Sequence, residues 1–61
     1  MKVPALNKAR EDLNHFIGSW NGEDTKFIHE GAIYHEDDVN CATEALEKIE
    51  ELQELLAELN I

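Results

Sequence analysis

The chain has 61 residues and 7.0 kDa, and its 14 acidic and 5 basic side chains give a formal net charge of −9 at pH 7. This length suits one small domain spanning residues 1–61. Contact with nucleic acid or anionic lipid depends on Lys and Arg, so the charge argues against both as direct partners. A single cysteine excludes an internal disulfide framework. With no apolar segment long enough for a signal core or a bilayer span, we expect a cytoplasmic protein.

The first predicted element is an amphipathic helix over residues 4–20. Pro4 suits the first helical turn, where its missing N–H costs nothing. Gly22 follows the helix, and we expect it to close the C-terminus in the left-handed conformation. His15 falls opposite the apolar face and is expected at the surface. Apolar side chains recur at steps of three and four along the predicted helix: Leu6, Ala9, Leu13, Phe16, Ile17 and Trp20.

Residues 25–35 predict a short β-hairpin. Two triplets, 27–29 and 32–34, flank Glu30-Gly31, and their β-branched and aromatic content suits strands joined by a two-residue turn. A short helix over the same residues is the competing interpretation. The expected cross-strand pairs are Phe27 with Tyr34 and Ile28 with Ile33.

A long second helix is predicted over residues 37–60. Glu36, Asp37 and Asp38 lie where a helix N-terminus favours negative charge, and one of them is expected to cap it. Residues 39–60 contain no Gly or Pro and are rich in Ala, Glu and Leu. The fold class is therefore mainly α, with a small α+β arrangement possible: an N-terminal amphipathic helix, a hairpin or turn segment, and a long C-terminal helix.

The apolar face of the second helix predicts two packing partners. With Ala42 at heptad position a, apolar residues fill a and d for three heptads. The full apolar arc is about 200° wide, which exceeds what one neighbouring helix covers. We expect the first helix to fold back on one side and a second copy of the chain to cover the other, giving a helical homodimer. The alternative is that the apolar C-terminal end of this helix is frayed and has no packing partner. The expected packing face comprises Ile49, Leu52, Leu55, Leu56 and Leu59.

Acidic residues line the rest of this helix. Residues 36–61 hold nine acids and one base, a net charge of −8, against −1 for residues 1–35. Like charges four residues apart destabilise a helix, so the pattern favours a binding surface for a basic partner. A face that serves only solubility is the alternative. The row consists of Glu44, Glu47, Glu50, Glu51, Glu54 and Glu58.

No catalytic, metal or cofactor site is predicted, and we expect no enzyme activity. Cys41 lies at the edge of the apolar arc and is expected to be a small buried hydrophobe. His29, His35 and Cys41 are ligand types that zinc accepts, but their intervals of six residues match no recognised metal motif. A metal-dependent sensor using these three residues is retained as a third hypothesis.

The sequence thus predicts a small acidic protein-binding and inhibitory module. It would present the carboxylates to a basic partner, such as a nucleic-acid-binding protein, and block it as a DNA mimic. A phage inhibitor of a host factor and an antitoxin-like protein are two analogies for such a module. The alternative is a structural or assembly module that dimerises or docks through the apolar face of the C-terminal helix.

Overall fold

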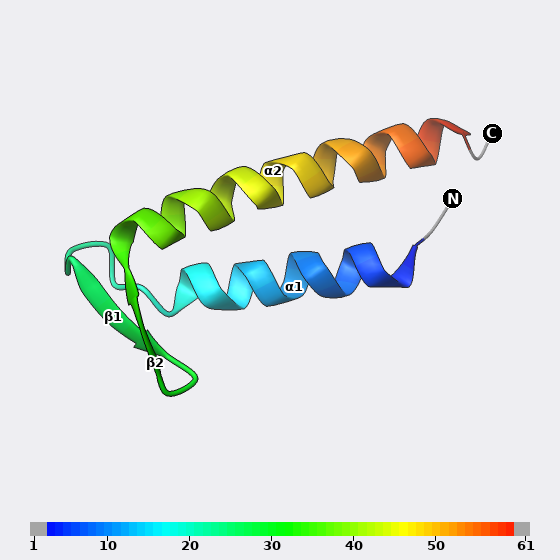
Figure 1. Cartoon of the computed structure of the whole chain (residues 1–61). Helices are drawn as coiled ribbons and strands as arrows, with labels where there is room; N and C mark the ends of the chain where they lie inside the picture. Colours follow the sequence, from blue (N-terminus) through cyan, green and yellow to red (C-terminus); the bar gives the residue numbers. More distant parts are fainter. Residues whose placement is uncertain (1–2, 60–61) are drawn as a thin grey trace.

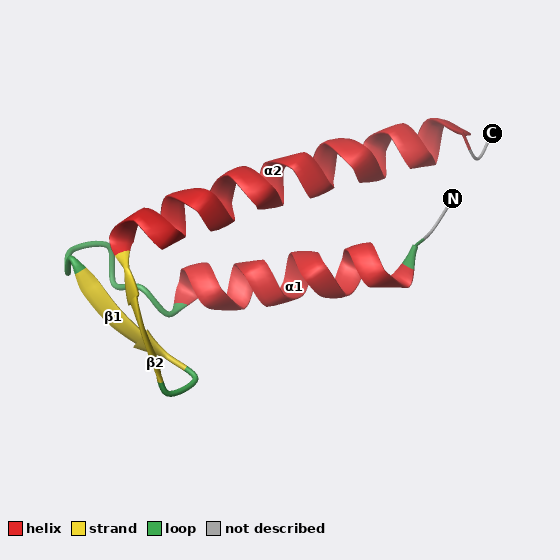
Figure 2. Cartoon of the chain, in the orientation of Figure 1, coloured by secondary structure: helices red, strands yellow, loops and turns green. Residues whose placement is uncertain are grey.

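The computed structural model describes residues 3–59 and is a helical hairpin whose arms are joined by a two-stranded antiparallel ribbon (Figures 1 and 2). The elements are α1 (Pro4–Gly18), β1 (Lys26–His29), β2 (Ala32–His35) and α2 (Glu36–Leu59). The helices run side by side in opposite directions, with the ribbon at one end and the start of α1 and the end of α2 at the other. This order confirms the predicted mainly α fold with a hairpin between two helices. The predicted end of α2 at Asn60 lies outside the described residues.

The first helix ends at Gly18, two residues before the predicted end at Trp20. Ser19 caps the C-terminus of α1. Its amide donates to the Phe16 carbonyl (3.1 Å), and its hydroxyl donates to the His15 carbonyl (3.1 Å). Gly22 does adopt a positive φ of +87°, but in the loop beyond the helix. The Trp20 indole N–H donates to the Asp24 carbonyl (2.7 Å) and fixes that loop.

The ribbon has the predicted register, with Phe27 opposite Tyr34 and Ile28 opposite Ile33. Glu30 and Gly31 have φ values of +50° and +82°, so both turn residues are left-handed as a two-residue hairpin turn of type I′ requires. Glycine adopts this conformation freely, but a glutamate pays for the crowding of its Cβ. The tight turn is therefore closed by an unfavourable residue at its first position.

Phe16 attaches the ribbon to the helices. The centroid of its ring lies 4.8 Å from that of Tyr34, 5.2 Å from that of His29 and 5.4 Å from that of Phe27. Edge-to-face and tilted pairs of this kind contribute about 0.5–1.5 kcal/mol each beyond the burial of their area. Because an isolated two-stranded ribbon is marginally stable in water, this cluster holds the inner face of the ribbon in place.

The second strand passes into α2 without a loop. The Glu36 amide donates to the Thr25 carbonyl (2.8 Å), which extends the ladder to the helix start. His35 caps the helix through Nδ1, which accepts from the Asp37 amide (3.1 Å), and the Asp38 carboxylate accepts from the His35 amide (3.0 Å). These bonds resemble a capping box with histidine at the N-cap, except that the histidine side chain bonds the second helical amide rather than the third. One of the three predicted acids, Asp38, therefore takes part in the cap.

Packing of α1 leaves the fold with a thin core. Among the described residues only Val39 and Ala42 are buried hydrophobics. The Cα radius of gyration is 13.7 Å, whereas a compact chain of 61 residues has one of about 10.5 Å. The accessible surface is 4735 Å², against about 4000 Å² for a compact monomer of this mass. The buried and partly buried positions of α2 recur at steps of three and four: Glu36, Val39, Ala42, Leu46, Ile49, Gln53 and Leu56.

Replacing Glu30 with asparagine is expected to stabilise the protein, because Asn-Gly suits a type I′ turn and asparagine tolerates the left-handed conformation. We expect a gain of about 1 kcal/mol, which corresponds to about 4–8 °C in Tm for a domain of this size. Thermal unfolding followed by circular dichroism measures it. Glu23→Asn is the control, since Glu23 has an ordinary φ. Equal Tm values for the two variants would contradict this interpretation of the turn.

Candidate functional site

Six carboxylates form a row along the exposed side of α2. Every member is exposed, and none of them joins an ion pair within residues 3–59. Lys48 lies one turn after Glu44 but stays outside ion-pair distance, so the one favourable pair expected from the sequence is not formed. The carboxylate row comprises Glu44, Glu47, Glu50, Glu51, Glu54 and Glu58.

An exposed apolar strip runs beside the carboxylate row. Leu52, Leu55 and Leu59 are 43%, 57% and 75% exposed, and we call them the leucine strip. At about 100° of rotation per residue, the strip lies between the side of α2 that packs on α1 and the carboxylate row. Lys48 falls within the strip. The long helix therefore carries three parallel surfaces, of which α1 covers one.

The predicted packing face divides between two of these surfaces. Ile49 and Leu56 are partly buried on the side of α1, whereas Leu52, Leu55 and Leu59 are exposed. In the heptad assignment with Ala42 at position a, the residues at positions a and e lie on the side of α1. The residues at position d are exposed to solvent. The sequence predicted one wide apolar arc that two packing partners would cover. The structure shows which residues of this arc lie on the side of α1.

A partly exposed polar network links the two helices on this side of α2. The Gln53 amide nitrogen donates to Oδ1 of Asn7 (2.8 Å), and Nη1 of Arg10 donates to Oε1 of Gln53 (3.0 Å). Paired polar groups at a packing position fix the register of neighbouring helices. With Ala42 at heptad position a, Gln53 falls at position e, as do Val39 and Leu46. Its recurrence seven residues after Leu46 and fourteen after Val39 was the signal that it shares their face.

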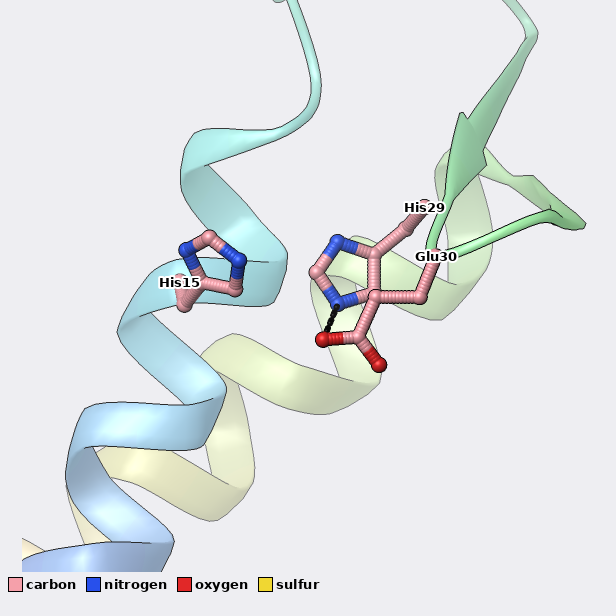
Figure 3. A group of neighbouring side chains, drawn as sticks. All are labelled: His15, His29 and Glu30. Carbon is pink, nitrogen blue, oxygen red and sulfur yellow. Dashed lines mark ion pairs between the residues drawn. The ribbon is translucent and has the colours of Figure 1, made fainter.

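The expectation that Cys41 is buried is wrong, since its side chain is exposed. Among residues 3–59, the structure does not gather Cys41 with His29 and His35 as the hypothesis of a metal-dependent sensor requires. A different group converges at the end of α1. His15, His29 and Glu30 each offer a ligand atom within 4.8 Å of the other two (Figure 3). His15 is exposed as expected, but its position beside the ribbon depends on a tertiary contact that helical periodicity does not contain.

The outer face of the ribbon carries a second apolar patch. Ile28 and Ile33 are opposite each other in the ladder and are 68% and 72% exposed. The aromatic residues Phe27 and Tyr34 point to the other face, where Phe16 covers them. The two isoleucines lie on the ribbon rather than on the long helix, so they form a separate surface from the leucine strip.

Comparison of the chain with family models, curated proteins and solved structures gave no match. Within residues 3–59, neither helix is both long enough and apolar enough to span a bilayer.

Replacing Glu47, Glu51, Glu54 and Glu58 with glutamine is expected to stabilise the protein. The change removes three repulsive pairs at i,i+4, each worth about 0.2–0.5 kcal/mol, for a total of about 1 kcal/mol at low salt. Glutamine and glutamate have similar helix propensity, so repulsion is the term that changes. Urea unfolding at low and at high salt measures it, and the gain shrinks as salt screens the charges. A variant less stable than the parent at low salt would contradict the repulsion.

Proposed function

We propose that the protein is a small acidic binding module that presents the carboxylate row to a basic protein and blocks a site there that holds nucleic acid. It acts as a homodimer joined through the leucine strip. The observation that carries the proposal is the row itself, six exposed carboxylates that no counter-charge within residues 3–59 pairs.

The spacing of the row supports a mimic of a phosphate backbone. Glu44 and Glu58 are 14 residues apart, which corresponds to about 21 Å of helix axis at about 1.5 Å per residue. One strand of B-DNA carries a phosphate every 3.4 Å or so, or about six over that length. Six carboxylates therefore match the linear charge density of one strand, and a cleft lined with Lys and Arg would accept either.

The energetic cost of the row also supports a binding role. Glu47 and Glu51, Glu50 and Glu54, and Glu54 and Glu58 are like-charge pairs four residues apart, and each costs about 0.2–0.5 kcal/mol. A face that serves only solubility would gain stability from interspersed lysines. In a protein with two buried hydrophobic residues among those described, such a cost is substantial.

The leucine strip supports self-association through α2. Three leucines, all more than two-fifths exposed, lie along one line of a helix whose other large aliphatic residues are buried or partly buried on the side of α1. Burying each large side chain contributes about 1.5–3 kcal/mol. A symmetric dimer would pair the strip with itself, and its adjacent carboxylate rows would form one larger acidic surface.

The dimer is tested by sedimentation equilibrium at micromolar concentration. We expect a mass of twice the 7.0 kDa chain for the wild-type protein. Leu55→Ser with Leu59→Ser is expected to give the monomer, because both side chains leave the interface. The matched control is Ile28→Ser with Ile33→Ser, which removes two equally exposed apolar residues from the ribbon and leaves the dimer intact. A wild-type monomer would refute the dimer.

The acidic surface is tested by capture of proteins from a cell lysate on the immobilised protein. We expect a basic, nucleic-acid-binding protein that is released by high salt and displaced by duplex DNA. Glu51→Gln with Glu54→Gln is expected to weaken capture at least tenfold. Glu11→Gln with Glu23→Gln changes the net charge equally but leaves the row intact, and it is expected to retain capture. Equal effects of the two double variants would refute a role for the row.

A structural or assembly module is the second candidate, and the exposure of the leucine strip favours it. In that case the strip would dock on a partner protein and the acids would only keep the chain in solution. The serine double variant would then abolish partner capture while the glutamine double variant would leave it unchanged. The two candidates therefore predict opposite results from the same pair of variants.

A further inference from the structure

Two imidazoles and one carboxylate converge where α1 meets the ribbon. His15 lies in the last turn of α1, His29 ends β1, and Glu30 begins the turn that follows (Figure 3). One ligand atom from each lies within 4.8 Å of the other two. Nitrogen donors of this kind suit zinc and other divalent transition metals, whereas magnesium and calcium prefer oxygen donors throughout.

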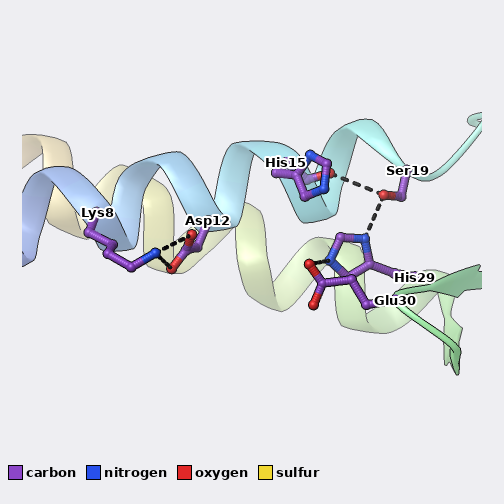
Figure 4. A network of polar contacts seen from close by, with 6 residues as sticks. All are labelled: Lys8, Asp12, His15, Ser19, His29 and Glu30. Carbon is purple, nitrogen blue, oxygen red and sulfur yellow. Dashed lines mark hydrogen bonds and ion pairs between the residues drawn. The ribbon is translucent and has the colours of Figure 1, made fainter.

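His29 is held in position by the surrounding rings. Its side chain is 11% exposed, and its ring centroid lies 5.2 Å from that of Phe16 and 5.1 Å from that of His15. Nδ1 of His29 lies 2.6 Å from Oγ of Ser19 (Figure 4). The ring is therefore oriented by packing and by a hydrogen bond before any ligand binds.

The Ser19 hydroxyl determines which nitrogen of His29 is available. Oγ of Ser19 donates its one proton to the His15 carbonyl (3.1 Å), since a carbonyl can only accept. Oγ must then accept from Nδ1 of His29, which carries a proton. In the neutral ring, Nε2 is left with a free lone pair. Metal-binding histidines commonly have this arrangement, in which the second nitrogen donates to a fixed oxygen.

The free nitrogen of His29 faces a carboxylate. Nε2 lies 3.8 Å from Oε1 of Glu30, and both atoms present lone pairs when the imidazole is neutral. A direct charged hydrogen bond would bring them to about 2.7–2.9 Å. Two ligands of one tetrahedral zinc ion stand about 3.3–3.5 Å apart, given metal–ligand bonds of about 2.0–2.2 Å. The observed separation is closer to that of two metal ligands than to that of a hydrogen bond.

We propose that His15, His29 and Glu30 form a three-ligand site for Zn²⁺ or a similar divalent transition metal. Glu30 is 75% exposed and His15 is exposed, so both side chains can close on the ion while His29 stays fixed. Three protein ligands leave one coordination position for water. Asp12, one turn before His15, pairs with Lys8 (3.2 Å; Figure 4) and is not used as a ligand.

The bound ion would join α1 to the turn of the ribbon. His15 belongs to α1, and His29 and Glu30 belong to the ribbon. Binding of the ion therefore favours the folded arrangement over the unfolded chain. A small domain with a thin core gains most from such a link. The site does not depend on the carboxylate row or on the leucine strip, which lie on α2.

The test uses the full chain with Cys41→Ser, which removes an exposed thiol that would also bind zinc. Zn²⁺ is titrated in competition with a chromophoric chelator, and Co²⁺ is used as a spectroscopic probe. We expect one ion per chain, a visible Co²⁺ spectrum of a four-coordinate site, and a higher Tm with Zn²⁺ but not with Mg²⁺. The absence of Zn²⁺ binding, or binding with no rise in Tm, would overturn the proposal.

Ligand variants locate the ion. His15→Asn and Glu30→Gln change exposed side chains, and both are expected to lose Zn²⁺ binding and the rise in Tm. Glu23→Gln, an exposed acid outside the cluster, is expected to bind as the parent does. Glu30→Asn is expected to fold more stably than the parent and still lose the metal, which separates binding from folding. Unchanged affinity in His15→Asn or Glu30→Gln would overturn the assignment.

Ser19 is assigned as a positioning residue. Ser19→Ala is expected to weaken Zn²⁺ binding about 10- to 100-fold, the usual effect of removing such an orienting group. Ser19→Thr keeps the hydroxyl and is expected to restore the affinity, a result that a purely structural role at the helix end would not require. Equal affinities of the alanine variant and the parent would refute the role of Ser19.

Discussion

The packing of α1 on one side of α2 is the constraint on which the rest of the structure depends. The long helix has more apolar surface than one neighbour covers, and the Asn7–Gln53–Arg10 network links α1 to one side of it. The leucine strip is left exposed on the other side, and the carboxylate row occupies the remainder of the helix. Our proposal of a dimer that binds a basic partner follows from this division of α2 into three surfaces.

The ribbon at the closed end of the helical hairpin is held by a separate set of contacts. A ribbon of two four-residue strands has little stability of its own, and Phe16 holds it to the helices through a cluster of rings. The same contact brings His29 against the end of α1, where Ser19 orients it. Glu30 occupies a left-handed turn position that asparagine would fill more favourably. A metal-binding role would account for a glutamate there, because its carboxylate faces Nε2 of His29.

Local patterns in the sequence were sufficient to predict the elements and the pairing of the strands. Helical periodicity and the Glu30-Gly31 turn act over a few residues, so the helices and the Phe27–Tyr34 register followed from them. The end of α1 was placed too late because Ser19, rather than Gly22, closes the helix. Contacts between distant segments could not be predicted from these local patterns. The position of Gln53 against Asn7 and the approach of His15 to His29 depend on how the helices and the ribbon pack.

We propose that a second copy of the chain covers the leucine strip. The most direct measurement is thermal unfolding over a hundredfold range of protein concentration, because only folding coupled to association makes the Tm depend on concentration. A dimer joined through the leucine strip predicts a Tm that rises with concentration in the wild-type protein and is constant in the Leu55→Ser, Leu59→Ser variant. A wild-type Tm independent of concentration, with the chain sedimenting as a monomer throughout that range, would contradict it.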